Sequence, residues 1–177
     1  MKRIVSLWFP KLASDRLVRT GEKDWQAEAA STVASRDGCP RLIALNPRAR
    51  DAGLRVHMRL ADARALIPDL VTANAAPAAD RTLVEALAGW CDRYTPWVAV
   101  DPLGAALAED EATQVCSAGG YGGDAGLLLD VTGCSHLFDP RDDKGGEAGE
   151  RALLADLTGR LSQAPVFGEN LFGGRCL

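Results

Sequence analysis

Two stretches decide the fold: Met1-Lys-Arg-Ile-Val-Ser-Leu-Trp-Phe-Pro10 and Gly126-Leu-Leu-Leu-Asp-Val-Thr-Gly-Cys-Ser-His-Leu-Phe138. In the first stretch an apolar run ends at Pro10. Because proline cannot donate a hydrogen bond to a neighbouring strand, this run predicts a short buried strand that ends there. In the second stretch, Leu127 to Val131 is short, apolar and partly β-branched, which is typical of an inner strand. The chain is therefore expected to place strands at both positions.

Apolar residues recur at helical spacing over much of the chain between and after these strands. The clearest helix has Leu83, Leu87, Trp90 and Tyr94 on one stripe. The other expected elements are a helix from Pro10 to Gly21, a strand at Arg41–Leu45, a helical turn at Arg48–Ala52, a short helix from Leu60 that Pro68 stops, a strand at Trp97–Val100 and a helix from about Glu147 to Gln163. Residues 21–37 show no clear period. The pattern predicts an α+β fold in which one sheet is backed by helices.

The charge of the chain is divided unevenly between its two halves. Residues 1–75 carry 13 Lys and Arg against 8 Asp and Glu, whereas residues 76–177 carry 7 against 16, and the whole chain has a net charge of −4. Local Lys and Arg provide most of the affinity of proteins for a phosphate backbone. Any contact with nucleic acid is therefore expected in the N-terminal half.

The cysteine content and the hydropathy of the chain indicate the cellular compartment in which the protein is expected. The five cysteines are scattered, and none forms a Cys-x-x-Cys pair, so we expect reduced, structural thiols in an intracellular protein. No apolar run reaches the length of a membrane-spanning helix, and the N-terminus lacks the apolar core of a signal peptide. The sequence therefore predicts a cytoplasmic protein with no membrane partner. The aromatic residues Trp8, Trp90 and Trp97 are expected in the core.

Several motifs, in order along the chain, resemble the Y-family translesion DNA polymerases and most closely their ImuB branch. They are Ser6-Leu-Trp-Phe-Pro-Lys-Leu-Ala-Ser-Asp-Arg16, Ala49-Arg-Asp-Ala-Gly-Leu-Arg-Val-His-Met58, Leu60-Ala-Asp-Ala-Arg-Ala-Leu-Ile-Pro68, Trp90-Cys-Asp-Arg-Tyr-Thr-Pro96 and Leu129-Asp-Val-Thr-Gly-Cys-Ser-His-Leu-Phe138. The resemblance implies a polymerase palm, one mixed sheet backed by helices, at residues 1–10 and 76–163. It implies a small helical fingers lobe at residues 11–75.

The resemblance also implies where the catalytic acids of an active member would stand, and this chain lacks them. The matching positions are Trp8, Ala125 and Gly126. Hard divalent ions such as magnesium require oxygen ligands, which these three side chains do not offer. We therefore expect no catalytic residue, no metal site and no cofactor. In the alternative, an active polymerase binds Mg²⁺ through substituted carboxylates, for which the candidates are Asp15, Asp101, Asp124 and Asp130.

The motifs of the expected fingers lobe differ in part from those of active family members. Pro47 and Arg50 match a Tyr and an Arg that hold the incoming triphosphate in active relatives, and Ala13 matches the residue that selects the sugar. A basic cluster around Gly53 consists of Arg48, Arg50, Arg55 and Arg59. These arginines are candidate nucleotide or DNA contacts. The alternative is an arginine-rich solvated face whose aliphatic stems pack on apolar neighbours.

The resemblance implies a non-catalytic accessory protein, or scaffold, of error-prone translesion synthesis in the bacterial DNA damage (SOS) response, associated with the nucleoid. Its implied partners are ImuA, the sliding clamp and a separate error-prone DNA polymerase. Residues 164–177 do not resemble the family and are expected to be an atypical tail, with thumb and little-finger domains absent. DNA binding by this part is therefore expected to be weak. A functionless fragment is the remaining possibility.

Overall fold

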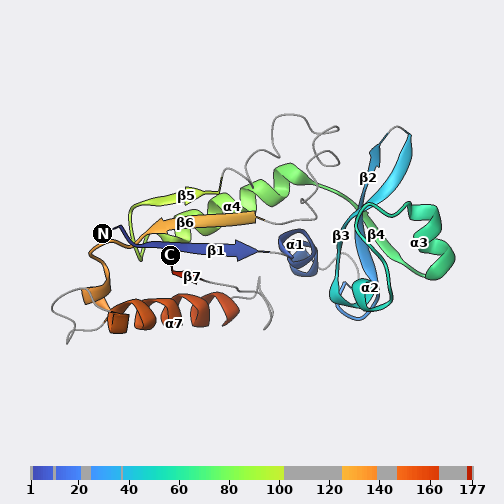
Figure 1. Ribbon diagram of the computed structural model, residues 1–177. Helices are drawn as coiled ribbons and strands as arrows, with labels where there is room; N and C mark the ends of the chain where they lie inside the picture. Colours follow the sequence, from blue (N-terminus) through green and yellow to red (C-terminus); the bar gives the residue numbers. More distant parts are fainter. Residues whose placement is uncertain are drawn as a thin grey trace.

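The computed structural model describes residues 2–9, 11–20, 25–36, 38–101, 125–138, 147–163 and 175–176. It contains two sheets, which lie in two parts of the molecule (Figure 1). A four-stranded sheet with two long helices forms the palm, at the left of the view. A three-stranded sheet with two short helices forms the lobe, at the right. The α+β class expected from the sequence is confirmed.

The palm sheet has the strand order β5-β6-β1-β7. These strands are β5 (Val98–Val100), β6 (Ala125–Asp130), β1 (Ile4–Phe9) and β7 (Arg175–Cys176). Among the described residues, the pairings in this sheet are antiparallel. The tail that does not resemble the family contributes β7, which pairs with β1 at Val5 and Ser6.

The covered face of the palm sheet follows from alternation along β1 and β6. Val5, Leu7 and Phe9 are buried, and the register places them opposite Leu129, Leu127 and Ala125. This set packs in one cluster with leucines of α4 (Pro77–Cys91) and α7 (Glu147–Gln163). Both helices therefore cover the same face. Complete burial of one such leucine contributes about 1.5–3 kcal/mol, so this face holds the palm together.

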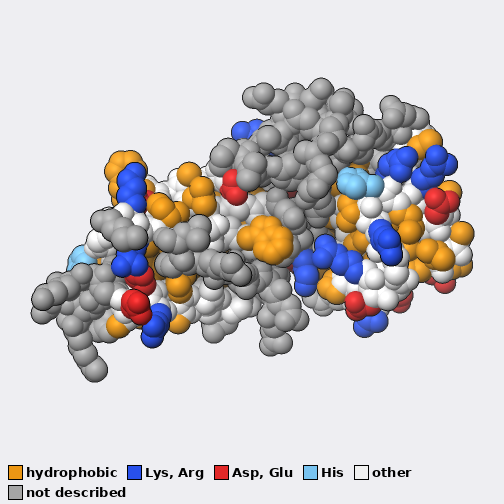
Figure 2. All heavy atoms as spheres, in the orientation of Figure 1, with side chains coloured by type: hydrophobic (Ala, Val, Ile, Leu, Met, Phe, Trp, Pro, Cys, Tyr) orange, Lys and Arg blue, Asp and Glu red, His pale blue; other side chains and the backbone are white. Residues whose placement is uncertain are grey.

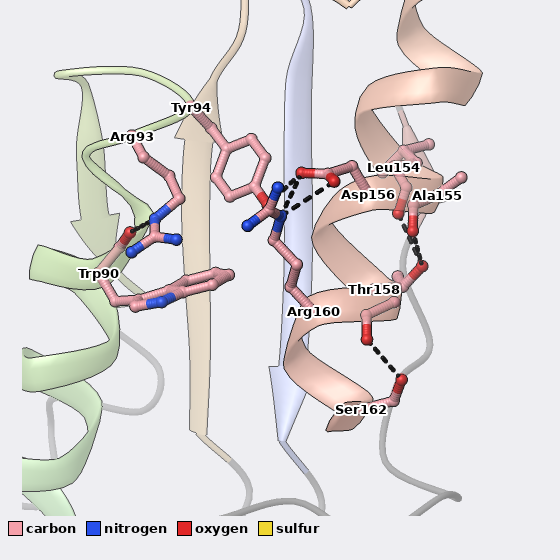
Figure 3. Close-up of polar contacts among 10 residues, drawn as sticks. Trp90, Arg93, Tyr94, Leu154, Ala155, Asp156, Thr158, Arg160 and Ser162 are labelled. Carbon is pink, nitrogen blue, oxygen red and sulfur yellow. Dashed lines mark hydrogen bonds and ion pairs between the residues drawn. The ribbon is translucent and has the colours of Figure 1, made fainter. Parts of the chain in front are cut away.

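A polar contact joins the two palm helices at the end of α4 (Figure 3). The Tyr94 hydroxyl donates to Asp156 Oδ2 over 2.8 Å, and Arg160 Nε donates to both Asp156 oxygens over 2.9 Å. The Tyr94 ring also stacks on Phe138, with 5.7 Å between ring centroids. Hydrogen bonds from Arg160 and Tyr94 lower the pKa of Asp156, which keeps it charged. The motif around Trp90 to Pro96 thus serves the packing of the palm.

The lobe contains more strand than the sequence indicates. Its sheet has the order β3-β2-β4, formed by β3 (Cys39–Leu45), β2 (Ala30–Arg36) and β4 (Val71–Asn74). The helices α2 (Pro47–Asp51) and α3 (Leu60–Leu66) occupy their expected positions. The expectation of a helical lobe therefore misses β2 and β4. The residues of β2, Ala-Ser-Thr-Val-Ala-Ser-Arg, are mostly small or polar, so no apolar alternation marks the strand.

Helix α1 (Leu12–Thr20) connects the two parts of the molecule. On the palm side, Arg16 donates to Asp80 of α4 in a mostly buried ion pair. On the lobe side, Leu17 packs with Trp25 and Ala30. Trp25, which is 2% exposed, lies in a segment for which the sequence predicts no element.

Two of the three expected core tryptophans are exposed instead. The exposed fraction is 47% for Trp8 and 74% for Trp97. Trp8 alternates with the buried Leu7 and Phe9 along β1, so its side chain lies on the face opposite the core. Trp90 is partly buried and packs against the palm core, with the Arg93 guanidinium 4.3 Å from its ring centroid. Within the described residues, no helix is long and apolar enough to cross a membrane.

Asn46 holds the lobe together through its side-chain amide. Its Oδ1 accepts from the N–H groups of Ala30, at 3.1 Å, and Ala49, at 2.9 Å. Its Nδ2 donates to the carbonyls of Trp25, at 2.8 Å, and Glu28, at 2.7 Å. Asn46 is 3% exposed, and three of the four hydrogen bonds are buried. The same side chain therefore caps α2 and fixes the start of β2.

Replacing Asn46 should destabilise the lobe strongly. Asn46→Ala leaves buried donors and acceptors without partners, each costing about 1–3 kcal/mol, and we expect a loss of about 3 kcal/mol in the free energy of unfolding, measured by urea denaturation. Asn74→Ala, a change at an exposed asparagine of β4, is the control and should cost less than about 0.5 kcal/mol. Equal effects of the two changes would contradict the role of Asn46.

Candidate functional site

The face of the palm sheet opposite α4 and α7, which we call the open face, carries two of the three positions where the sequence predicts missing acids. The register pairs Trp8 of β1 with Gly126 of β6. The N–H of Asp101 donates to the Gly126 carbonyl over 2.9 Å, directly after β5. Trp8 of β1, Gly126 of β6 and Asp101, directly after β5, thus form a row, which we call the palm row. Because Gly126 is the register partner of Trp8, the row lies on the face opposite the helices.

Ala125 does not belong to the palm row. It is 8% exposed and packs in the core cluster opposite Phe9. Adjacent residues of a strand point to opposite faces, so Ala125 and Gly126 cannot both serve the open face while this register holds. The structure therefore separates two positions that the sequence placed together.

Gly126 is closely packed by its neighbours. A Cβ atom at this position would lie 3.1 Å from Asp101 Cβ, 3.1 Å from the Leu7 carbonyl oxygen and 3.2 Å from Asp101 Oδ2. All three contacts are tighter than ordinary van der Waals contact, and one of them is to backbone. A side chain at position 126 would require these neighbours to move by a few tenths of an ångström. The glycine thus permits the close approach of Asp101 and β1.

The chemistry of the palm row does not match that of a divalent metal centre. Magnesium in phosphoryl-transfer enzymes is held by carboxylates and other oxygen ligands, and in the palm row Asp101 supplies the one carboxylate. Among the described residues, no group of three or more His, Cys, Asp or Glu could hold a metal ion. The expectation that the protein uses no metal remains a prediction.

The other candidate carboxylates lie apart from the palm row. Asp130 is four residues from Gly126 along β6, about 13 Å at the usual strand rise. Its Oδ1 accepts from the N–H of Thr132 over 3.0 Å, and hydrogen bonds from Thr132 lower its pKa. The Asp130 carboxylate thus binds the chain's own backbone. Asp124 lies outside the described residues. Of the described candidates, Asp101 alone adjoins the predicted site.

Asp15 has an unusual environment on α1. Burial raises the pKa of its carboxyl to about 7, and the charge of Lys11 lowers the pKa by less. Its Oδ2 is buried without a hydrogen-bond partner, as is Nη2 of Arg16. The ion pair of Arg16 with Asp80 is also poorly solvated. Burial raises the pKa of Asp80, and the hydrogen bond and charge of Arg16 oppose this increase without cancelling it. The contact of α1 with α4 therefore contains charges that cost desolvation free energy.

The four candidate arginines lie on the lobe, away from the palm row. Arg48, Arg50, Arg55 and Arg59 are all exposed, and Figure 2 shows Lys and Arg side chains over this part of the molecule. Arg48 Nε donates to the Gln26 carbonyl over 2.9 Å, which ties that side chain to the loop before β2. The positive φ of 89° at Gly53 ends the turn after α2. The structure thus gathers the cluster on one lobe, and its ligand remains a prediction.

Two further positions of the predicted nucleotide site have different environments. Ala13, at the sugar-selecting position, is 4% exposed and forms part of the first turn of α1. Pro47 begins α2, and its neighbour Asn46 caps the helix. Arg41 of β3 also lies on the lobe, where its Nη1 donates to the His57 carbonyl over 2.8 Å.

Sequence comparison finds similar curated proteins. The chain is 43% identical over 111 residues to Protein ImuB of two strains of Caulobacter vibrioides, a match that covers 63% of this chain. The chain spans 18% of the length of these relatives. No family model matches the sequence. The predicted resemblance to ImuB is confirmed at the level of sequence similarity.

Comparison with solved structures finds the Y-family polymerase fold. A post-insertion binary complex of Dbh DNA polymerase matches with a TM-score of 0.68 and 9% identity, covering 99% of this chain and 42% of that chain. An insertion ternary complex of Dbh gives 0.63 at 9% identity, with 98% and 42% covered. DinB from Sulfolobus solfataricus gives 0.57 at 11% identity, also with 98% and 42% covered. These matches establish the fold and confirm the predicted palm architecture.

Asp15 should make stability depend on pH. Its pKa of about 7 in the folded chain exceeds the ordinary value of 3.8, so the folded state binds the proton more tightly than the unfolded state does. The stabilisation from protonated Asp15 is complete below about pH 4 and is lost as the pH rises to about 7. Asp15→Asn should therefore raise the free energy of unfolding at pH 8 by about 1–2 kcal/mol, a value discounted for partial exposure.

The measurement is urea denaturation of both proteins at pH 5 and pH 8. We expect the advantage of Asp15→Asn to shrink at pH 5, where the wild-type carboxyl is already neutral. Asp62→Asn, a change at an exposed residue of α3, is the control. An equal effect of Asp15→Asn at both pH values would show that the carboxyl is not titrating.

Proposed function

We propose that this chain is part of a non-catalytic Y-family polymerase homologue that acts as an accessory protein, or scaffold, in error-prone translesion DNA synthesis. The palm row carries the proposal. In a fold shared with DNA polymerases, it presents an indole, a glycine and one carboxylate. The match to Protein ImuB over 63% of the chain supports the choice of branch.

The palm row has too little negative charge for catalysis. Two-metal phosphoryl transfer requires ligands that neutralise two divalent ions close together. The attraction between a dication and a carboxylate at contact is worth several kcal/mol even at an effective dielectric constant of about 20. One carboxylate supplies a small part of what two ions require, and Gly126 contributes no ligand.

The proposed partners follow from the same similarity. They are ImuA, the sliding clamp and a separate error-prone polymerase that performs the synthesis, in the bacterial cytoplasm near the nucleoid. DNA is proposed as a weak ligand of the arginine lobe, where exposed guanidinium groups can contact phosphates. The proposed function needs no cofactor.

An active polymerase is the second candidate, and Asp101 is the observation that favours it. Its carboxylate lies beside Gly126, at the position of one lost acid. Such an enzyme would have to complete a two-metal site with ligands from outside the described residues. A primer-extension assay separates the two functions.

We expect no extension of a primed template by the purified chain with Mg²⁺ or Mn²⁺, because the palm row cannot hold two ions. The full-length protein should behave in the same way. An active Y-family polymerase, assayed in parallel, is the positive control. Extension above background that disappears in Asp101→Asn would overturn the proposal in favour of the second candidate.

The arginine lobe should contribute to DNA affinity through charge. The double change Arg50→Gln and Arg55→Gln removes two phosphate contacts, so it should weaken binding of a fluorescent duplex severalfold in 50 mM salt and reduce the salt slope by about 2. Fluorescence anisotropy at several salt concentrations measures both quantities.

The matched control is Arg81→Gln together with Arg151→Gln, two changes on the palm helices that remove the same charge. Each of these arginines pairs with a glutamate four residues away. If the two double variants reduce affinity equally, the effect comes from net charge and the lobe is not a DNA contact.

A further inference from the structure

His57 of the lobe has a backbone conformation that few residues with a side chain adopt. Its φ is 68°, and it is the one non-glycine residue with a positive φ among those that the structure describes. Residues in this left-handed region are uncommon, and they persist where the surrounding structure fixes them. Because such residues cluster at ligand-binding and catalytic sites, the surroundings of His57 are a candidate site.

Backbone hydrogen bonds and one arginine side chain hold His57 in place. The N–H of His57 donates to the Leu42 carbonyl over 2.8 Å, and the N–H of Leu42 donates to the Met58 carbonyl over 2.9 Å. Nη1 of Arg41 donates to the His57 carbonyl over 2.8 Å. The guanidinium group of Arg41 is therefore fixed beside the backbone of His57.

Arg59 stands directly opposite Arg41. The two residues form an antiparallel bridge between β3 and the segment that precedes α3. The hydrogen bond from Leu42 to Met58 flanks this bridge, so the pair is of the non-hydrogen-bonded type, in which opposite side chains come closest. Like charges at opposite positions repel, and among the described residues neither arginine forms an ion pair with an acid. An anion bound to both would relieve that repulsion.

The surrounding part of the lobe has the charge of an anion-binding surface. Residues 39–74 contain six Arg and no Lys, against three Asp and no Glu. Arg59 is exposed, and Arg41 and His57 are partly exposed, so a ligand can reach each of them from solvent. Figure 2 shows basic side chains and a histidine on the visible face of the lobe. Guanidinium groups bind phosphate oxygens through pairs of N–H donors, and an imidazole N–H adds a further donor.

The arrangement favours the phosphates of a nucleic acid backbone over a free nucleotide. A small ligand is bound mainly by enclosure in a concave, mostly apolar pocket. Backbone phosphates are instead contacted by cations spread over an exposed surface. Arg50 and Arg55 are exposed on the same lobe as Arg59, and they provide cations for neighbouring phosphates.

We propose that Arg41, His57 and Arg59 form a binding site for a backbone phosphate of DNA. Arg59 and the His57 imidazole contact the phosphate, while Arg41 positions His57 and adds positive charge. The inference deepens the proposed function, on which it rests, because it identifies where the lobe makes its weak DNA contact. The competing interpretation is that these arginines only protect β3, at the edge of its sheet, from pairing with another chain.

The first test compares two exposed arginines of the lobe in the full chain, by fluorescence anisotropy of a labelled duplex at several salt concentrations. Arg59→Gln should weaken binding about threefold in 50 mM salt and lower the salt slope by about 1, because it removes a phosphate contact. Arg64→Gln, further along α3, removes the same charge and should change affinity by less than about 1.5-fold. Equal effects of the two variants would overturn the inference.

His57→Gly separates binding from folding. Glycine adopts a positive φ without strain, so this variant should be at least as stable as wild type in urea denaturation. It should nevertheless bind the duplex about threefold more weakly, because it lacks the imidazole donor. Wild-type affinity in His57→Gly would show that the imidazole makes no contact and would contradict the proposed site.

Proton NMR of the wild-type chain provides a readout that no variant's stability affects. The ring resonances of His57 should shift on addition of the duplex, while those of the other histidine, the exposed His136 of the palm, should not. ATP is the probe for a free nucleotide, and it should shift the His57 resonances only at a higher concentration than the duplex does. A shift with ATP at the lower concentration would assign the site to a nucleotide and overturn the inference.

The outcomes separate this inference from the proposed function. If Arg59→Gln binds the duplex as Arg64→Gln does, while the double change at Arg50 and Arg55 still weakens binding, the lobe contacts DNA elsewhere and the phosphate site is wrong. Metal-dependent primer extension would overturn the non-catalytic function without changing any of these binding measurements.

Discussion

The structure depends on the register of one antiparallel pair, in which Trp8 of β1 stands opposite Gly126 of β6. The register directs Val5, Leu7 and Phe9, with their partners on β6, into the helix-covered core. It directs Trp8 and Gly126 to the other face. A slip of one residue would expose the core and bury Trp8, so the packing of the palm and the character of its open face have one cause.

Much of the palm could be predicted from the sequence because its signals are local. The apolar run before Pro10 and the leucine stripe of α4 each report a periodicity that the structure preserves. Strand β2 gave no such signal, because its position is set by pairing with β3 and β4 and by the side chain of Asn46. The exposure of Trp8 could not be foreseen, since tryptophan is usually buried and here register overrides that preference.

The positions that form the candidate site could be predicted from the sequence, but their arrangement could be predicted only in part. Matching motifs identified positions 8, 125 and 126, whereas the structure shows that Ala125 faces the core and that Asp101 adjoins Gly126. The lobe and the palm also differ in charge, with exposed arginines around α2 and a palm row that presents a carboxylate.

The central claim is that the palm row is not a divalent metal centre, and Mn²⁺ binding tests it most directly. Mn²⁺ added to the purified chain should give the electron paramagnetic resonance signal of the free ion, unchanged between wild type and Asp101→Asn. Loss of free-ion signal that corresponds to one or two tightly bound ions in wild type, and that is abolished in Asp101→Asn, would contradict the account.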